Sequence, residues 1–105
     1  MALVDDVYTF VEAFPNTEKY GLSSQITRSA VSIPSNIAEG SARDSDKELV
    51  RFLTISRASA AEIETQLLIS DNLGYLESTN NKINEELIEI LKMLTALINT
   101  IKQRI

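Results

Sequence analysis

The stretch from Tyr20 to Arg43 constrains the fold more than any other, because it carries two opposed stripes at helical spacing. One stripe is apolar and comprises Leu22, Ile26, Ala30, Ile33 and Ile37. The other is polar, equally regular, and comprises Gln25, Arg28, Ser32, Asn36, Glu39 and Arg43. A polar stripe this ordered, in a stretch with so few charges, predicts contacts to a neighbouring helix rather than a solvated face.

Pro34 lies in the middle of this predicted helix. Its ring crowds the carbonyl of Ala30 and it removes one backbone hydrogen bond, so we expect a kink there. A full break into two short helices is the alternative. Gly40 is the expected C-terminal cap residue, which places this helix at about 22–40.

A short helix at about 2–14 is predicted before it, ended by Pro15-Asn16. The longest helix is predicted at about 45–74, because Ser45 and Glu48 form a capping box and Gly74 can end the helix. The last helix is predicted at about 79–104, starting near Ser78–Asn80. Its apolar residues follow the four-three alternation of a coiled-coil seam: Ile83, Leu87, Ile90, Leu94, Leu97 and Ile101.

Short connections between these helices favour antiparallel neighbours. We therefore expect an all-α fold, an up-down-up-down antiparallel four-helix bundle with a short first helix, as a single domain over 1–105. The last two helices are apolar over a wider band than a bundle core needs. The first helix is too short to cover them, so leftover apolar surface predicts self-association, with cyclic symmetry as the default.

Composition excludes several classes of function. The chain has no Cys and no His, so thiolate and histidine chemistry is absent, and no cofactor, metal site or small-molecule substrate is identified. No apolar run reaches the roughly 18 residues of a membrane span, and the N-terminus does not resemble a signal peptide. We expect a cytoplasmic protein. The net charge of −5 disfavours nucleic-acid binding, although Arg28 and Arg43 make 22–43 locally positive.

The polar stripe is expected to face the third helix across the Gly40–Asp44 loop. That hairpin places Arg28 opposite Ser59 to Glu62 and predicts a buried Arg28–Glu62 ion pair. The predicted inter-helix network comprises Gln25, Arg28, Ser32, Asn36, Glu39, Ser59, Glu62 and Gln66. A network of this kind fixes the register of a bundle when every group is satisfied. A small-ligand site is the alternative and requires a cavity there, whereas an enzyme reading of Glu39, Glu62 and Glu64 has the least support.

Basic residues near the second loop are the candidates for nucleic-acid contacts: Arg43, Lys47, Arg51 and Arg57. Asp44, Asp46 and Glu48 lie among them, so ordinary surface ion pairs are the simpler explanation of these cations.

The stretch YGLSSQITRSAVSIPSNIAEGSAR, followed by SDKELVRFLTISRASAAEIETQL, resembles the bacterial four-helix bundle proteins of the 23S ribosomal RNA intervening-sequence (S23-like) family. The resemblance extends from Val7 to Ile105. Its most specific positions are Tyr20, Gly21, Leu22, Gln25, Arg28, Ser32, Pro34, Asn36, Ile37, Glu39, Gly40, Arg43, Phe52, Leu53, Ser59, Glu62, Glu64, Thr65, Gln66 and Leu67.

This resemblance implies a four-helix bundle and a ring-shaped homopentamer. Some members are encoded within insertions in ribosomal RNA genes, and a similar fold serves as a basic accessory subunit of diversity-generating retroelements. No catalytic residues are implied. The chain departs from the pattern in its shorter first helix and its net charge of −5.

The combined prediction is a non-enzymatic, self-assembling bundle of unassigned physiological role that acts as an interaction or scaffold protein, with a pentamer favoured. The alternative is an RNA- or DNA-binding accessory protein that acts as a ring-shaped oligomer.

Overall fold

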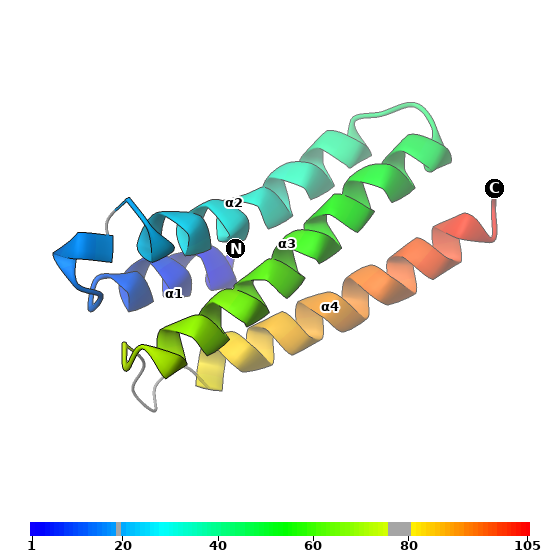
Figure 1. Ribbon diagram of the computed structural model, residues 1–105. Helices are drawn as coiled ribbons and strands as arrows, with labels where there is room; N and C mark the ends of the chain where they lie inside the picture. The colour runs from blue at the N-terminus through cyan, green and yellow to red at the C-terminus, as the bar shows by residue number, and fades with distance from the viewer. Residues whose placement is uncertain (19, 76–80) are drawn as a thin grey trace.

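The computed structural model describes residues 1–18, 20–75 and 81–105, and it confirms an all-α bundle of four long helices. They are α1 (Ala2–Val11), α2 (Leu22–Ser41), α3 (Asp46–Asn72) and α4 (Asn81–Lys102), with one 3-10 turn at Asn16–Glu18. In Figure 1, α2, α3 and α4 run antiparallel to their sequence neighbours, and α1 lies beside one end of α2. The start predicted near Ser78–Asn80 for the last helix lies outside the described residues.

The helix ends follow local chemistry. Ser45 caps α3 by accepting a hydrogen bond from the Glu48 amide at 3.1 Å, and Gly74 takes φ +77° just after α3 ends. The first helix is shorter than predicted, because its last turn tightens: the Phe14 amide donates to the Val11 carbonyl at 3.0 Å. Pro15 follows directly and prevents the chain from continuing as a helix.

The second helix stays helical across Pro34, so the alternative of a full break is wrong. Near this point α2 and α3 pack closely, because the buried Ser56 hydroxyl donates to the Ile33 carbonyl at 2.9 Å. Closer to the hairpin, a Cβ added at Gly40 would lie 2.8 Å from the Phe52 Cβ. Small residues of α2 and α3 therefore allow the two helices to approach closely at these two positions.

The core has two parts that differ in how many helices enclose them. One part draws buried residues from all four helices, including Leu3 and Val7 of α1. The other consists of Leu53, Leu94, Ile98 and Ile101, with no residue from α1. At about 1.5 Å per residue α1 spans about 15 Å and α3 about 40 Å. The end of the bundle near the α2–α3 hairpin is therefore enclosed by three helices, as Figure 1 shows.

Candidate functional site

A groove of about 370 Å³ runs between α2 and α3 on the outer face of this hairpin. The polar stripe of α2 forms one wall, and side chains of α3 form the other. The groove is lined by Gln25, Arg28, Ser29, Ser32, Ile55, Ser59, Glu62 and Gln66. Six of the eight residues predicted for the inter-helix network thus border one groove, and Asn36 and Glu39 lie outside its lining.

Hydrogen bonds connect the two walls of the groove. The Ser32 and Ser59 hydroxyls lie 2.8 Å apart, in the register that the hairpin prediction required. The Asn36 amide nitrogen donates to the Ser32 Oγ at 2.9 Å and to the Ser32 carbonyl at 2.8 Å. These two hydrogen bonds from Asn36 orient Ser32, the α2 member of the serine pair.

Ser29 makes the second connection, and the sequence prediction missed it. Its hydroxyl donates to Glu62 Oε2 at 3.3 Å and accepts from Gln66 Nε2 at 3.3 Å. Gln25, Ser29, Ser32 and Asn36 also follow a helical four-three-four spacing, so the pattern was present in the sequence. This spacing, which places Ser29 on the same helix face as Ser32, was the signal that could have identified it.

The prediction of a buried Arg28–Glu62 ion pair is wrong. Both residues are exposed, and no ion pair joins them in the described part of the chain. Ser29 occupies the buried position. Consecutive side chains of an α-helix point about 100° apart around its axis, so Arg28 lies at the rim of the groove. Gln25 is likewise exposed. Glu39 lies apart from the network and pairs with Arg43.

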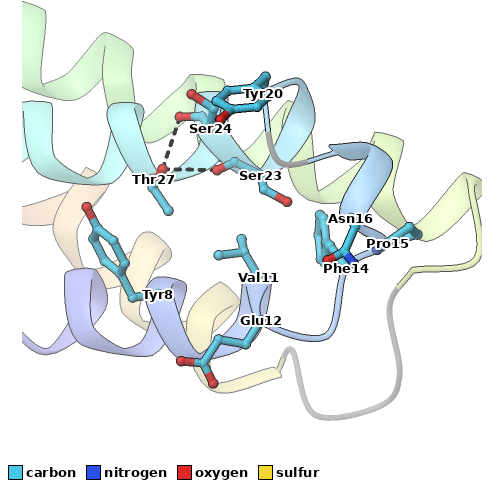
Figure 2. Close-up of a pocket in the computed structure, with 10 residues that line it drawn as sticks. All are labelled: Tyr8, Val11, Glu12, Phe14, Pro15, Asn16, Tyr20, Ser23, Ser24 and Thr27. Carbon is cyan, nitrogen blue, oxygen red and sulfur yellow. Dashed lines mark hydrogen bonds between the residues drawn. The ribbon is translucent and has the colours of Figure 1, made fainter.

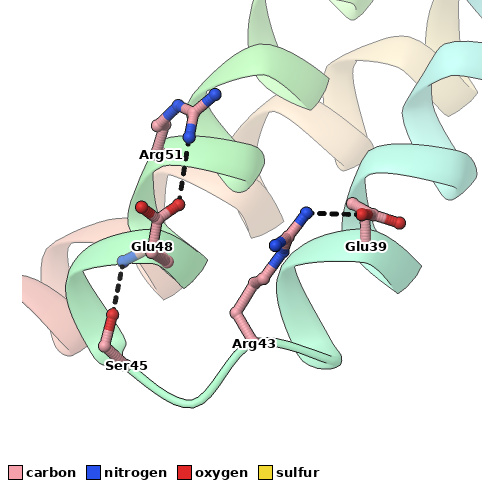
Figure 3. Close-up of polar contacts among 5 residues, drawn as sticks. All are labelled: Glu39, Arg43, Ser45, Glu48 and Arg51. Atoms are coloured by element: carbon pink, nitrogen blue, oxygen red, sulfur yellow. Dashed lines mark hydrogen bonds and ion pairs between the residues drawn. The ribbon is translucent and has the colours of Figure 1, made fainter.

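Two of the four predicted basic residues, Arg43 and Arg51, are paired with carboxylates near the hairpin loop (Figure 3). Arg43 pairs with Glu39 at 2.6 Å and Arg51 with Glu48 at 3.1 Å. Both guanidinium groups also lie over the Phe52 ring, 5.0 and 5.1 Å from its centroid.

Two predicted cations at this end have no ion-pair partner among the described residues, namely the exposed Lys47 and the partly buried Arg57. A further cation, Arg104 of α4, pairs with Asp46 at 3.1 Å. The hairpin end is therefore a mixed charged surface rather than a basic one.

A second, larger hollow of about 470 Å³ lies between α1 and the start of α2. Figure 2 shows Tyr8 and Val11 from α1, with Glu12 just after it, on one side, and Ser23, Ser24 and Thr27 from α2 on the other. The Thr27 hydroxyl is already bonded at 3.0 Å to the carbonyls of Ser23 and Ser24. None of the residues predicted for a site lines this hollow, so we do not assign a function to it.

Asp6 of α1 and Glu86 of α4 form a carboxyl pair between these two helices. Asp6 Oδ2 and Glu86 Oε2 are both buried without a hydrogen-bond partner, and Lys82 Nζ lies 3.4 Å from Asp6 Oδ2. Burial raises the pKa of the Glu86 carboxyl, and the neighbouring Asp6 carboxyl raises it further. The positive charge of Lys82 lowers the pKa of Glu86, and the negative charge of Glu89 raises it.

The described residues contain no group of three or more His, Cys, Asp or Glu side chains arranged to hold a metal ion. None of the described helices combines the length and the apolarity needed to cross a membrane.

Comparison with known proteins gives the family. A solved structure with a similar fold is a protein of unknown function from the S23 ribosomal protein family of Bacteroides thetaiotaomicron. Its TM-score is 0.78 at 28% identity, over 90% of this chain and 87% of that chain. No curated protein matches the chain significantly. The family described as "23S rRNA-intervening sequence protein" matches residues 1–96, and the chain therefore belongs to that family.

Proposed function

We propose that the chain is a non-enzymatic, self-assembling bundle that acts as an interaction scaffold. The observation that carries this proposal is the apolar face of α4 at the three-helix end, where Met93 is 68% exposed and Leu97 45% exposed. Exposed apolar side chains that adjoin one another typically mark a protein–protein interface.

The position of these two residues on α4 strengthens the argument. Lys82 and Glu86 face α1, and Met93 follows Glu86 by seven residues, or about two helical turns. Leu97 follows Met93 by four residues. Met93 and Leu97 therefore continue, beyond the start of α1, the same face of α4 that α1 covers. A neighbouring subunit packed there would serve as the fourth helix of this half of the bundle.

A closed ring is the expected form of the assembly, because most soluble homo-oligomers have closed symmetry. The family resemblance favours five subunits. Non-enzymatic action is supported by the lack of His and Cys and by the groove serines, which bond to one another or to neighbouring side chains. We place the assembly in the cytoplasm, in keeping with a sequence that has no Cys.

The mass of the assembly in solution, measured by light scattering and native mass spectrometry, tests the proposal. We expect a uniform oligomer for the wild type and dissociation for Met93→Glu and Leu97→Glu, because each places a charge in an apolar contact. Thr17→Glu is the matched control, since it adds the same charge at an exposed site in the 3-10 turn. A monomer at about 100 μM wild type, a concentration at which a micromolar interface would be nearly saturated, would refute self-assembly. Glutamate variants with the wild-type mass would refute this face as the interface.

Nucleic-acid binding by the ring is the alternative function, and it rests on Arg43, Lys47, Arg51 and Arg57. It has less support, because the carboxylates that pair with Arg43 and Arg51 also repel phosphates. Fluorescence anisotropy with structured RNA and duplex DNA at about 50 and 200 mM salt distinguishes the two roles. Affinity that falls by orders of magnitude across this range would favour the accessory role. Absence of binding by an intact oligomer would favour the scaffold.

A further inference from the structure

The α2–α3 groove holds polar groups that the inter-helix network leaves unused. Arg28, on the α2 wall, makes no ion pair or hydrogen bond with any described residue. Glu62, on the α3 wall, uses only one of its carboxylate oxygens, Oε2, to accept from Ser29. Gln66 is 8% exposed, and its amide oxygen is buried without a partner. Opposite charges and an unsatisfied acceptor therefore border the same space.

A hydroxyl donor completes this set. Either hydroxyl can donate in the Ser32–Ser59 bond, so one hydroxyl proton of this pair remains unused by the bond. When Ser32 donates, the unused proton belongs to Ser59, which lines the groove. Arg28 and Ser59 can then act as the donors of the site, with Glu62 and Gln66 as its acceptors.

We propose that this groove binds a small zwitterion of the free amino acid class. The ligand carboxylate would lie against the Arg28 guanidinium and the Ser59 hydroxyl. Its ammonium group would lie against the Glu62 carboxylate and the Gln66 amide oxygen, while Ile55 contacts its apolar part. Charge-assisted hydrogen bonds of this kind are the stronger ones in proteins.

The charges of the site exclude the simpler ligands. Glu62 repels phosphate and other anions, and Arg28 repels a plain cation, so a ligand with both charges satisfies the site best. The volume of about 370 Å³ is near the lower end of the usual range for ligand pockets, about 300–1,000 Å³, and indicates a small molecule.

The purely structural role of these residues is already fulfilled without Arg28. Ser29, Ser32 and Ser59 connect α2 to α3 through their own hydrogen bonds. The groove also lies on the α2–α3 hairpin, apart from Met93 and Leu97 of α4, so different variants test ligand binding and the self-assembly proposed above.

Titration of the wild-type protein with each proteinogenic L-amino acid tests the proposal. The thermal midpoint and the ¹⁵N–¹H side-chain amide signals of Gln66 and Gln25 report binding in the groove. We expect at least one amino acid, at up to about 10 mM, to raise the midpoint and to shift the Gln66 signals. Its N-acetyl derivative and its carboxamide derivative should each bind at least about tenfold more weakly, since each loses one charge-assisted contact.

Two variants and a matched control locate the site. Arg28→Gln and Glu62→Gln should each weaken binding at least about tenfold, and both should fold normally because both side chains are exposed. Glu64→Gln makes the same change at an exposed α3 position outside the groove and should bind as the wild type does. The proposal is overturned if no amino acid shifts the Gln66 signals. It is equally overturned if the two variants retain wild-type affinity, or if acetate binds as tightly as the amino acid.

Discussion

Ser29→Ala is the substitution that best separates the observed packing from the ion pair that the sequence predicted. It removes the acceptor of Gln66 Nε2 and the donor to Glu62 Oε2, both at 3.3 Å. Gln66 is 8% exposed and its amide oxygen already lacks a partner, so the whole side-chain amide would be left unsatisfied. Glu62 is exposed, and water can replace its lost bond.

These terms give the expected magnitude. An unsatisfied buried polar group costs about 1–3 kcal/mol. Alanine has a higher helix propensity than serine, by roughly 0.5 kcal/mol, which offsets part of that cost. The free energy of unfolding should therefore fall by about 0.5–2.5 kcal/mol. For a domain near this size each kcal/mol lowers the melting temperature by about 4–8 °C.

Urea denaturation and thermal melting monitored by circular dichroism measure this change. Arg28→Ala is the matched control, because it alters the neighbouring residue at the exposed rim. It should change stability by no more than about 0.5 kcal/mol, as is usual at exposed sites. A loss of about 3–5 kcal/mol in Arg28→Ala, with Ser29→Ala near neutral, would mean that Arg28 and Glu62 form a buried pair after all.

Two further substitutions test other contacts. Burial and the neighbouring carboxylate raise the pKa of Glu86, so the folded state holds this proton more tightly than the unfolded chain, and the stabilisation is lost as pH rises through the raised pKa. Glu86→Gln should therefore flatten the stability profile at pH values above the ordinary carboxyl pKa in urea titrations, relative to the exposed control Glu85→Gln; parallel profiles would contradict it. Gly40→Ala gains about 1 kcal/mol of helix propensity but sets a Cβ 2.8 Å from that of Phe52, so we expect net destabilisation in thermal melts, and a more stable variant would refute the close packing. Ala38→Gly, at an exposed position of the same helix, measures the propensity term alone.

Much of the fold was predictable because its signals are local. The apolar spacing and the end signals of each segment require only neighbouring residues, and Ser45 and Gly74 act at the ends of α3 as expected. Two end signals were misplaced: α1 ends at Val11, before Pro15, and Gly40 lies inside α2, which ends at Ser41. The hairpin register was predictable as well, because the short loop after α2 leaves little freedom in how α2 and α3 align. The Ser32–Ser59 contact follows from that register.

The composition of the candidate site required the tertiary structure. The side chains of Arg28 and Ser29 point about 100° apart around the axis of α2. Each of them belongs to a polar stripe with residues spaced three or four apart, as in an α-helix. Which of the two faces α3 depends on the rotation of α2 about its own axis. That rotation is set by the whole core, including Ile26, Ala30 and Ile33, which are fully buried. The small Ser29 occupies the close contact, and the long Arg28 remains at the rim.

The remaining features depend on contacts between residues far apart in the chain. Asp6 and Glu86 meet because α1 packs against α4, and neither local sequence indicates the other. Met93 and Leu97 belong to an apolar band that the sequence shows clearly, yet only the position of α1 decides that they stay exposed. Sequence periodicity thus determined which faces of the helices are apolar. The arrangement of the helices determined which of those faces are covered, because burial depends on the neighbours that reach each face.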